Sequence, residues 1–206
     1  MTTLLQLNSS IFSNDGQSSR LANEFVTAWR TAHPAARIIA RDFARDPVPH
    51  LTAERFQSFL AEPEERNAEQ HAVVAYSDTL IDELRRADVI VLGLPMYNFG
   101  VPSQLKAYFD HVARAGVTFR YTEKGSKSLL TGKKVYVFAA RGGLYAGTPL
   151  DTQTAYVRNF LSLLGITDVE FVYAEGLNIS ATRKQAALAH AAHAIERLNA
   201  PQRAAA

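Results

Sequence analysis

The stretch VIVLGLPM, residues 89–96, is the most apolar run of the chain and constrains how the rest can fold. It is far too short to cross a bilayer, because a membrane-spanning helix needs about 20 apolar residues. A strand with apolar side chains on both faces has to be covered on both, and such strands lie in the middle of parallel sheets. We therefore expect residues 89–94 to form the central strand of a parallel sheet.

Shorter runs with strand character stand on either side of this stretch, at residues 4–7, 37–42, 135–140 and 169–174. Helical patterns separate them, and the first places Leu21, Phe25 and Trp29 four residues apart. Strands that alternate with helices form right-handed βαβ units. The sequence predicts an α/β fold: a doubly wound, five-stranded parallel sheet with helices on both faces, in the flavodoxin-like order 2-1-3-4-5.

The remaining segments are expected to be peripheral. Residues 43–77 are polar and predict one or two surface helices inserted between the units, after which Asp78 would cap a short helix carrying Leu80, Ile81 and Leu84. Residues 119–133 predict a hairpin-like excursion, and residues 200–206 a frayed tail. No repeat or linker divides residues 1–206, so we expect a single domain.

Composition narrows the classes of function. The net charge of +2 over 206 residues is too weak a basic bias to favour a nucleic-acid partner. The chain has no cysteine, and although His190 and His193 share a helix face, no third ligand accompanies them, so we expect no metal site. The N-terminus does not resemble a signal peptide. We therefore expect a cytoplasmic protein with no membrane partner.

Three unusual loops follow the first, third and fourth predicted strands. In the predicted strand order these loops meet at the point where the order reverses, which is where ligands bind in such sheets. The first loop, residues 9–19, is rich in hydroxyl and amide groups and leads into a helix, with Ser18 or Ser19 as the expected N-cap. Free backbone N–H groups there favour an anion. Ser10, Gln17 and Ser18 are candidate donors and Gly16 permits close approach, which suits a monophosphate; ordinary helix capping explains the same composition equally well.

The second loop, PMYNFGVP at residues 95–102, carries large apolar side chains and an amide. Met96, Tyr97 and Phe99 could cradle a flat ring system whose edge bonds to Asn98. Packing of the aromatic rings on the polar insertion or on a partner subunit is the alternative.

The third loop, residues 140–145, holds Ala140, Arg141 and two adjacent glycines. Gly142 and Gly143 permit positive φ and close approach of the backbone, and their N–H groups could bond to ring carbonyls of a ligand; a plain strand-to-helix turn is the alternative.

Several long motifs resemble one known family. These are PMYNF (95–99), QLKAYFDHVARAGVTFRYTEKG (104–125), TGKK (131–134), ARGG (140–143) and FLSLLGITDVEFVYAEG (160–176). They are very similar to the FMN-dependent NADH azoreductases, and the similarity runs from about Leu4 to about Gly176. The family commonly has serine where this chain has Gly16, and often serine where it has Ala140, so two hydroxyl groups are missing here.

The resemblance implies a homodimer with FMN at the subunit interface. It implies reduction of quinones, and of azo compounds to amines, by NADH or NADPH in a ping-pong mechanism through flavin N5. Ser10, Gly16, Gln17 and Ser18 would hold the phosphate. Met96, Tyr97, Asn98 and Phe99 would hold one side of the isoalloxazine, and Ala140, Arg141, Gly142 and Gly143 its pyrimidine end. Phe99, Tyr121 and Tyr145 would meet the substrate.

Two other functions stay open on the sequence: a flavodoxin-type electron carrier and a non-redox binding module on the same fold. Such carriers tend to be shorter and strongly acidic, which this chain is not. The sequence ranks neither the acceptors nor the two nicotinamide donors.

Overall fold

The structure is a computed structural model that describes residues 1–123 and 125–200. Its centre is a parallel sheet of five strands in the order β2-β1-β3-β6-β7. Their bounds are β1 Thr3–Asn8, β2 Arg37–Asp42, β3 Val89–Pro95, β6 Lys134–Ala140 and β7 Asp168–Ala174. The predicted flavodoxin-like α/β fold is confirmed. Counting only these five strands gives the expected order; β4 and β5 belong to a separate hairpin.

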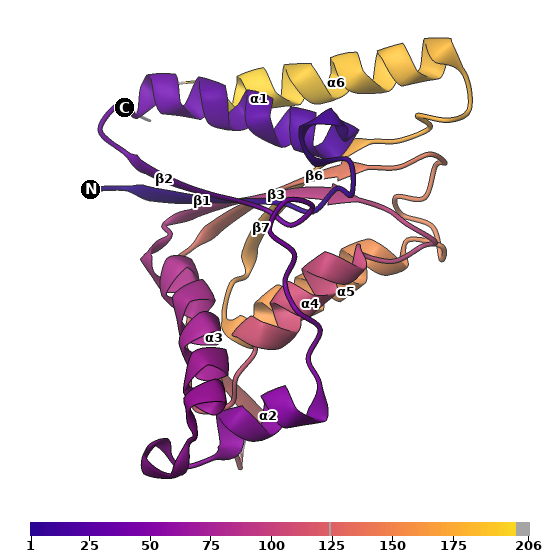
Figure 1. Cartoon of the computed structure of the whole chain (residues 1–206). Helices are drawn as coiled ribbons and strands as arrows, with labels where there is room; N and C mark the ends of the chain where they lie inside the picture. The colour runs from indigo at the N-terminus through magenta and orange to yellow at the C-terminus, as the bar shows by residue number, and fades with distance from the viewer. Residues whose placement is uncertain (124, 201–206) are drawn as a thin grey trace.

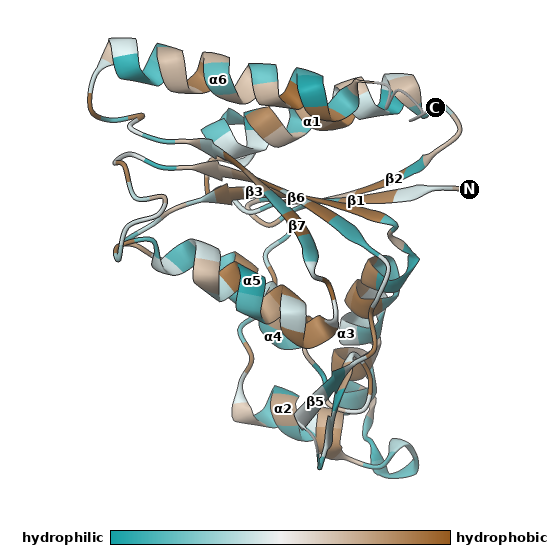
Figure 2. Cartoon of the chain, turned by 180° about the vertical axis from the view of Figure 1, so that it is seen from behind, coloured by the Kyte–Doolittle hydropathy of each residue, from teal (hydrophilic) through white to brown (hydrophobic). Residues whose placement is uncertain are grey.

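Helices cover both faces of the sheet (Figure 1). On one face lie α1, Gln17–Ala32, and α6, Ala181–Asn199; on the other lie α3, Ala68–Arg86, α4, Ser103–Val112, and α5, Thr152–Leu164. Each face has its own apolar cluster, with Phe25 and Phe138 on the α1 side and Leu92 and Phe109 on the other. Figure 2 shows many brown, apolar residues along the strands of the sheet, between the two layers of helices. Burial on both faces is what the apolar character of β3 predicted.

The segment after β2 differs from its prediction. The short helix α2, Ala53–Leu60, lies in the expected insertion, but α3 begins at Ala68 and not at Asp78. Asn67 caps α3 in a capping box with Gln70: each side chain bonds to the other residue's backbone N–H, at 2.9 and 3.0 Å. The first buried apolar residue of α3 is Val73, so its first turn carries no apolar period that could reveal it.

The expected hairpin is present: β4, Phe119–Thr122, pairs antiparallel with β5, Gly125–Ser128. It lies beside α2, on the side of the molecule away from α1 and α6 (Figure 2). Gly165 ends α5 in the left-handed conformation, φ 97°, which glycine adopts without a steric penalty. Residues 201–206 of the expected frayed tail lie outside the described residues, and Ala200 is the C-cap of α6.

All five sheet strands run parallel, so their carboxyl ends share one edge, at the right in Figure 1. The three loops singled out from the sequence leave the sheet at this edge. Within the described residues, no helix is both long and apolar enough to cross a membrane.

Candidate functional site

A hollow of about 200 Å³ opens at this edge, and all three predicted loops border it. The first loop contributes Ser10, Phe12, Gly16 and Gln17, the second Pro95, Met96 and Tyr97, and the third Ala140, Arg141 and Gly142. A fourth segment, not foreseen from the sequence, adds Leu177, Asn178 and Lys184. The expected convergence of the loops is therefore observed.

The first loop leaves the N-terminus of α1 without a side-chain cap. Gly16, and not Ser18 or Ser19, occupies the N-cap position, and no side chain of the described residues caps the first turn. Ser18 and Ser19 lie inside that turn, both fully buried, and neither hydroxyl has a hydrogen-bond partner. An uncapped helix start beside a buried, unpaired hydroxyl suits an anion such as a phosphate.

Gly16 is required for close approach of the chain to Ser10. A Cβ atom on Gly16 would lie 2.1 Å from Ser10 Oγ and 2.5 Å from Ser10 Cβ. Ser10 Oγ accepts a hydrogen bond from the N–H of Phe12 at 3.2 Å and lies 3.4 Å from the hydroxyl of Tyr97. That hydroxyl also accepts from the N–H of Ile11 at 3.3 Å, so Tyr97 ties the first loop to the second.

The second loop is a tight turn with an unusual backbone. Tyr97 and Gly100 exchange two backbone hydrogen bonds, and the residues between them have positive φ: Asn98 at 50° and Phe99 at 64°. Asparagine tolerates this conformation, whereas a bulky residue there is strained. Two residues of α5 fix the turn: Thr152 donates to the carbonyl of Phe99, and Gln153 donates to the carbonyls of Pro95 and Gly100 at 2.8 and 3.1 Å.

Two aromatic side chains of the second and third loops stand together, although neither lines the hollow. The ring of Phe99 is 46 % exposed and meets that of Tyr145 edge to face, with ring centres 5.4 Å apart. The third aromatic residue expected at the substrate site, Tyr121, lies in β4 and does not border the hollow. It is 77 % exposed and packs against Phe119.

The third loop is anchored by the side chain of Arg141, which is among the largest fully buried side chains. Its guanidinium pairs with Asp151 at 2.9 Å and Glu175 at 3.1 Å, and lies over the ring of Tyr173. Burial opposes ionisation of Asp151, but hydrogen bonds from Arg141 and Thr154 outweigh it and lower the pKa of that carboxyl. The charge of Arg141 is thus taken up within the protein.

Glu175 links Arg141 to the backbone of the third loop and of the residue after it. Its carboxylate accepts hydrogen bonds from the backbone N–H groups of Tyr145 and Ala146, both at 2.9 Å. Glycine permits both positive φ and close approach at Gly142 and Gly143, and the structure uses close approach, since neither residue has positive φ. Their lack of side chains serves close packing: a Cβ on Gly142 would lie 2.7 Å from Asn178 Nδ2, and one on Gly143 2.5 Å from the hydroxyl of Tyr145.

A second hollow near Phe99 is mainly apolar, at about 450 Å³. Phe99, Gly100, Val101, Ser103, Lys106, Thr152, Gln153 and Tyr156 line it. It lies between the second loop and the helices α4 and α5, so Phe99 borders open space on this side.

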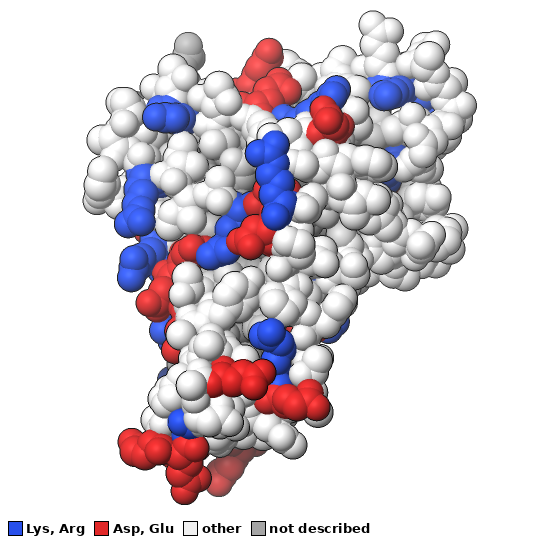
Figure 3. All heavy atoms as spheres, viewed as in Figure 1, with Lys and Arg blue, Asp and Glu red and all other residues white. Residues whose placement is uncertain are grey.

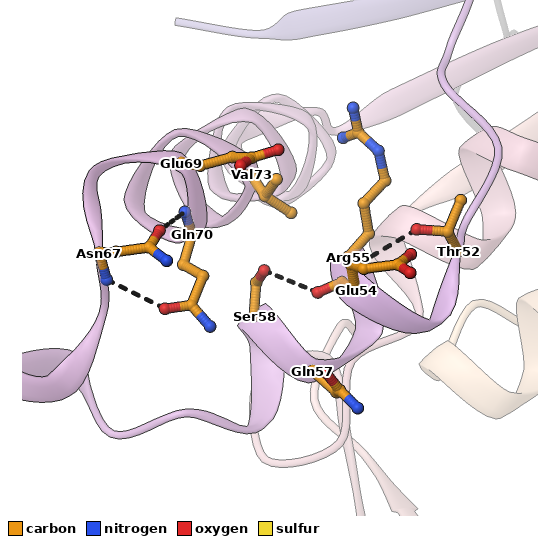
Figure 4. Close-up of a pocket in the computed structure, with 9 residues that line it drawn as sticks. All are labelled: Thr52, Glu54, Arg55, Gln57, Ser58, Asn67, Glu69, Gln70 and Val73. Carbon is orange, nitrogen blue, oxygen red and sulfur yellow. Dashed lines mark hydrogen bonds between the residues drawn. The ribbon is translucent and has the colours of Figure 1, made fainter.

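A third hollow, between α2 and α3, is lined mainly by polar and charged side chains (Figure 4). Four of the side chains drawn there are hydrogen-bonded locally: Asn67 and Gln70 with each other's backbone, Thr52 with the N–H of Arg55, and Ser58 with the carbonyl of Glu54. These contacts cap or brace the two helices, so we do not assign a function to this hollow.

An open parallel sheet with an anion-suited hollow at its topological switch point defines the flavodoxin-like class of nucleotide-binding α/β proteins. The family model described as "Flavodoxin-like fold" matches residues 2–198, and the chain belongs to that family. Among curated relatives, the FMN-dependent NADH:quinone oxidoreductase of Cellvibrio japonicus is 57% identical over 95% of this chain and 98% of its own. FMN-dependent NADH:quinone oxidoreductase 6 of Burkholderia lata is 54% identical over 95% of this chain and 98% of its own.

Solved structures agree with these relatives. The FMN-dependent NADH-azoreductase of Bacillus anthracis in complex with FMN has a TM-score of 0.86 at 26% identity, covering 97% of this chain and 100% of its own. An azoreductase structure from the Sterne strain of the same organism has a TM-score of 0.88 at 25% identity, covering 97% of this chain and 99% of its own. The family suggested by the sequence motifs is therefore confirmed.

Proposed function

We propose that this protein is an FMN-dependent NADH:quinone oxidoreductase that also reduces azo compounds. The observation that carries the proposal is the hollow in which three loops meet beside the uncapped start of α1 and the unpaired hydroxyl of Ser18. The curated relatives with this name are similar over nearly their whole length, which supports the same activity. Bound FMN would supply the redox chemistry by accepting and passing on a hydride.

The three loops would hold different parts of the cofactor. Ser10, Gln17 and Ser18 would bond to the phosphate while Gly16 lets the backbone approach it. Met96, Tyr97, Asn98 and Phe99 would lie against one side of the ring system, with the turn itself fixed by α5. The backbone of Ala140, Arg141, Gly142 and Gly143 would face the pyrimidine end, where N–H donors stabilise developing negative charge.

Donor and acceptor would use the same space in turn, as a ping-pong mechanism requires. Phe99 and Tyr145, whose rings contact each other, would form the aromatic edge of that space within one subunit. NADH, the donor in the names of the relatives, is the donor we propose, with NADPH as the alternative. Because these donors are intracellular cofactors, we propose that the protein acts in the cytoplasm.

The identity of the cofactor is the first test. Heat release followed by chromatography should yield FMN and no FAD, because the hollow has one anion-suited helix start and the first loop carries no second phosphate motif. Reconstituted protein should oxidise NADH rapidly in stopped flow. Recovery of FAD, or of no flavin after reconstitution, would refute the assignment.

We also propose a homodimer with the active site at the interface. The loops at the carboxyl edge of the sheet expose six large apolar residues, each to about half of its surface or more: Ile11, Phe12, Phe99, Leu144, Leu150 and Ile179. Figure 3 shows charged side chains gathered over the α2 and α3 region, and few on the side over α5 and these loops. An apolar surface of this kind usually meets a partner, and a second subunit would allow Tyr121 to reach a neighbouring site.

Sedimentation at assay concentration should therefore show two 22.7 kDa chains in the active species. Tyr121→Ala should leave FMN affinity unchanged and lower kcat/KM for the acceptor, since Tyr121 is remote from the hollow of its own subunit. An active monomer would contradict the dimer.

Phe99 should matter for catalysis and hardly for stability. In Phe99→Gly, release of a left-handed conformation is worth about 1–2 kcal/mol, and it offsets the lost burial of a half-exposed ring, about 1 kcal/mol. We expect the free energy of unfolding to change by less than about 1 kcal/mol, while kcat/KM for quinones falls. Urea denaturation and quinone kinetics measure the two effects.

Phe25→Ala is the matched control for stability. Phe25 is fully buried, so its truncation should cost about 3–5 kcal/mol. Equal destabilisation by the two variants would show that Phe99 is a packing residue.

A further inference from the structure

The first turn of α6 carries an unusual charge. Arg183 and Lys184 lie in it, and it contains no acidic residue. The helix dipole disfavours cations at a helix N-terminus, so two adjacent cations there oppose the local electrostatics. Among the residues described, 1–123 and 125–200, neither side chain forms an ion pair. No ion pair within the described part of the chain compensates this charge.

Lys184 borders the hollow at the switch point, whereas Arg183 does not. The side chains of the hollow that come from the first loop, Ser10 and Gln17, are neutral. Arg141 is the other cation of the lining, and Asp151 and Glu175 already neutralise it. Lys184 is therefore the uncompensated charge of the described lining.

The position of α6 brings Lys184 close to the start of α1. The two helices pack side by side over the same face of the sheet (Figure 1). Both begin at the carboxyl edge, and Gln17, the first residue of α1, lines the hollow together with Lys184. The ammonium group of Lys184 on one helix thus borders the same hollow as the uncapped start of the other.

We infer that Lys184 binds the 5′-phosphate of FMN through an ion pair between its Nζ and a phosphate oxygen. This rests on the proposed function and adds to it the one full positive charge that the first loop lacks. An ammonium group is a compact point charge that suits a phosphate, and its effect should depend on salt. The phosphates of the nicotinamide donor are the other source of the same chemistry, and the test separates the two.

The test compares FMN with riboflavin, which has the same ring system and no phosphate. Apoprotein of the parent and of Lys184→Gln is titrated with each flavin by fluorescence quenching at low and high salt. Glutamine is a good helix former and Lys184 is exposed, so the variant should fold like the parent. We expect the Kd for FMN to rise roughly tenfold with a smaller salt dependence, and the Kd for riboflavin to stay unchanged.

Arg183→Gln is the matched control from the same turn. The Cδ of Arg183 lies 3.8 Å from the position of a Cβ on Gly176, and its side chain does not line the hollow. Its FMN affinity should stay within about twofold of the parent, because a charge outside the hollow is screened by solvent. Thermal unfolding of all three apoproteins should show that neither glutamine variant has lost stability, since each removes a cation from a helix N-terminus.

Three results would overturn the inference: unchanged FMN affinity in Lys184→Gln, equal weakening of FMN and riboflavin, or a raised KM for NADH with FMN affinity intact. The last would assign Lys184 to the donor. A parent protein that binds neither flavin would instead refute the proposed function as a whole.

Discussion

Replacing Arg141 by methionine is expected to lower the free energy of unfolding by about 3–5 kcal/mol, as removal of one member of a buried ion pair does. The guanidinium is fully buried and serves both Asp151 and Glu175. Without the guanidinium, the two largely buried carboxylates have no positive charge beside them. The ring of Tyr173 also loses the cation that lies over it. Urea denaturation of the apoprotein, followed by circular dichroism, measures the loss.

Arg158→Met is the matched control. Arg158 lies over the ring of Phe171 much as Arg141 lies over Tyr173, but it is exposed and has no carboxylate partner among the described residues. Its loss should change stability by no more than about 0.5 kcal/mol. If the two variants were equally stable, the ion pairs of Arg141 would be as weak as surface pairs, and the third loop would owe its order to something else.

Patterns within the chain were enough to predict the sheet. A strand buried on both faces has to be apolar throughout, so residues 89–94 were recognisable without any contact information. The start of α3 was not recognisable, because Asn67 and Gln70 fix it by hydrogen bonds in a polar segment where no apolar period has begun. Local hydrogen bonding thus overrode the hydrophobic signal.

The site was predictable to the extent that topology fixes it. The first, third and fourth strands end at one edge, so their loops had to meet. The fifth strand ends at the same edge, and that reasoning could have added Asn178 and Lys184; nothing in the composition of residues 175–184 pointed to them. The positive φ of Phe99 had no sequence signal, because the turn is imposed by hydrogen bonds from Thr152 and Gln153 on α5.

Gly142 and Gly143 show that the sequence alone does not reveal which property of glycine a position requires. The sequence allowed either unusual φ angles or close approach of the backbone, and the structure shows close approach: Asn178 and Tyr145 leave no room for a Cβ atom. The tip of a tyrosine can move aside, but the backbone and Cβ of a serine cannot. The least tolerant of the loop glycines that border the hollow should therefore be Gly16, which meets Ser10.

Gly16→Val should raise the Kd for FMN roughly ten- to hundredfold, the loss expected when about 1.5–3 kcal/mol of hydrogen bonding to a charged group is removed. A Cβ would lie 2.5 Å from Ser10 Cβ, so Ser10 has to move, and with it the hydrogen bond to Phe12 and the contact with Tyr97. Fluorescence quenching of FMN by the apoprotein measures the affinity, and circular dichroism checks folding. Gly100→Ala is the control, because a Cβ there meets only the carbonyl of Tyr97 at 3.6 Å.

The double variant Ser10→Gly with Gly16→Ser tests two causes of weaker FMN binding. One is the collision between residue 16 and Ser10, and the other is the loss of the Ser10 hydroxyl group from its place. The Cβ of the new serine would enter the space that the Ser10 hydroxyl leaves, so the backbone need not move and one hydroxyl group stays at the same place. We expect the double variant to bind FMN within about one order of magnitude of the parent, whereas Gly16→Ser alone should resemble Gly16→Val. If Gly16→Ser alone bound FMN as tightly as the parent, the first loop would be able to rearrange freely. The close approach of Gly16 to Ser10 would then have no part in holding the phosphate.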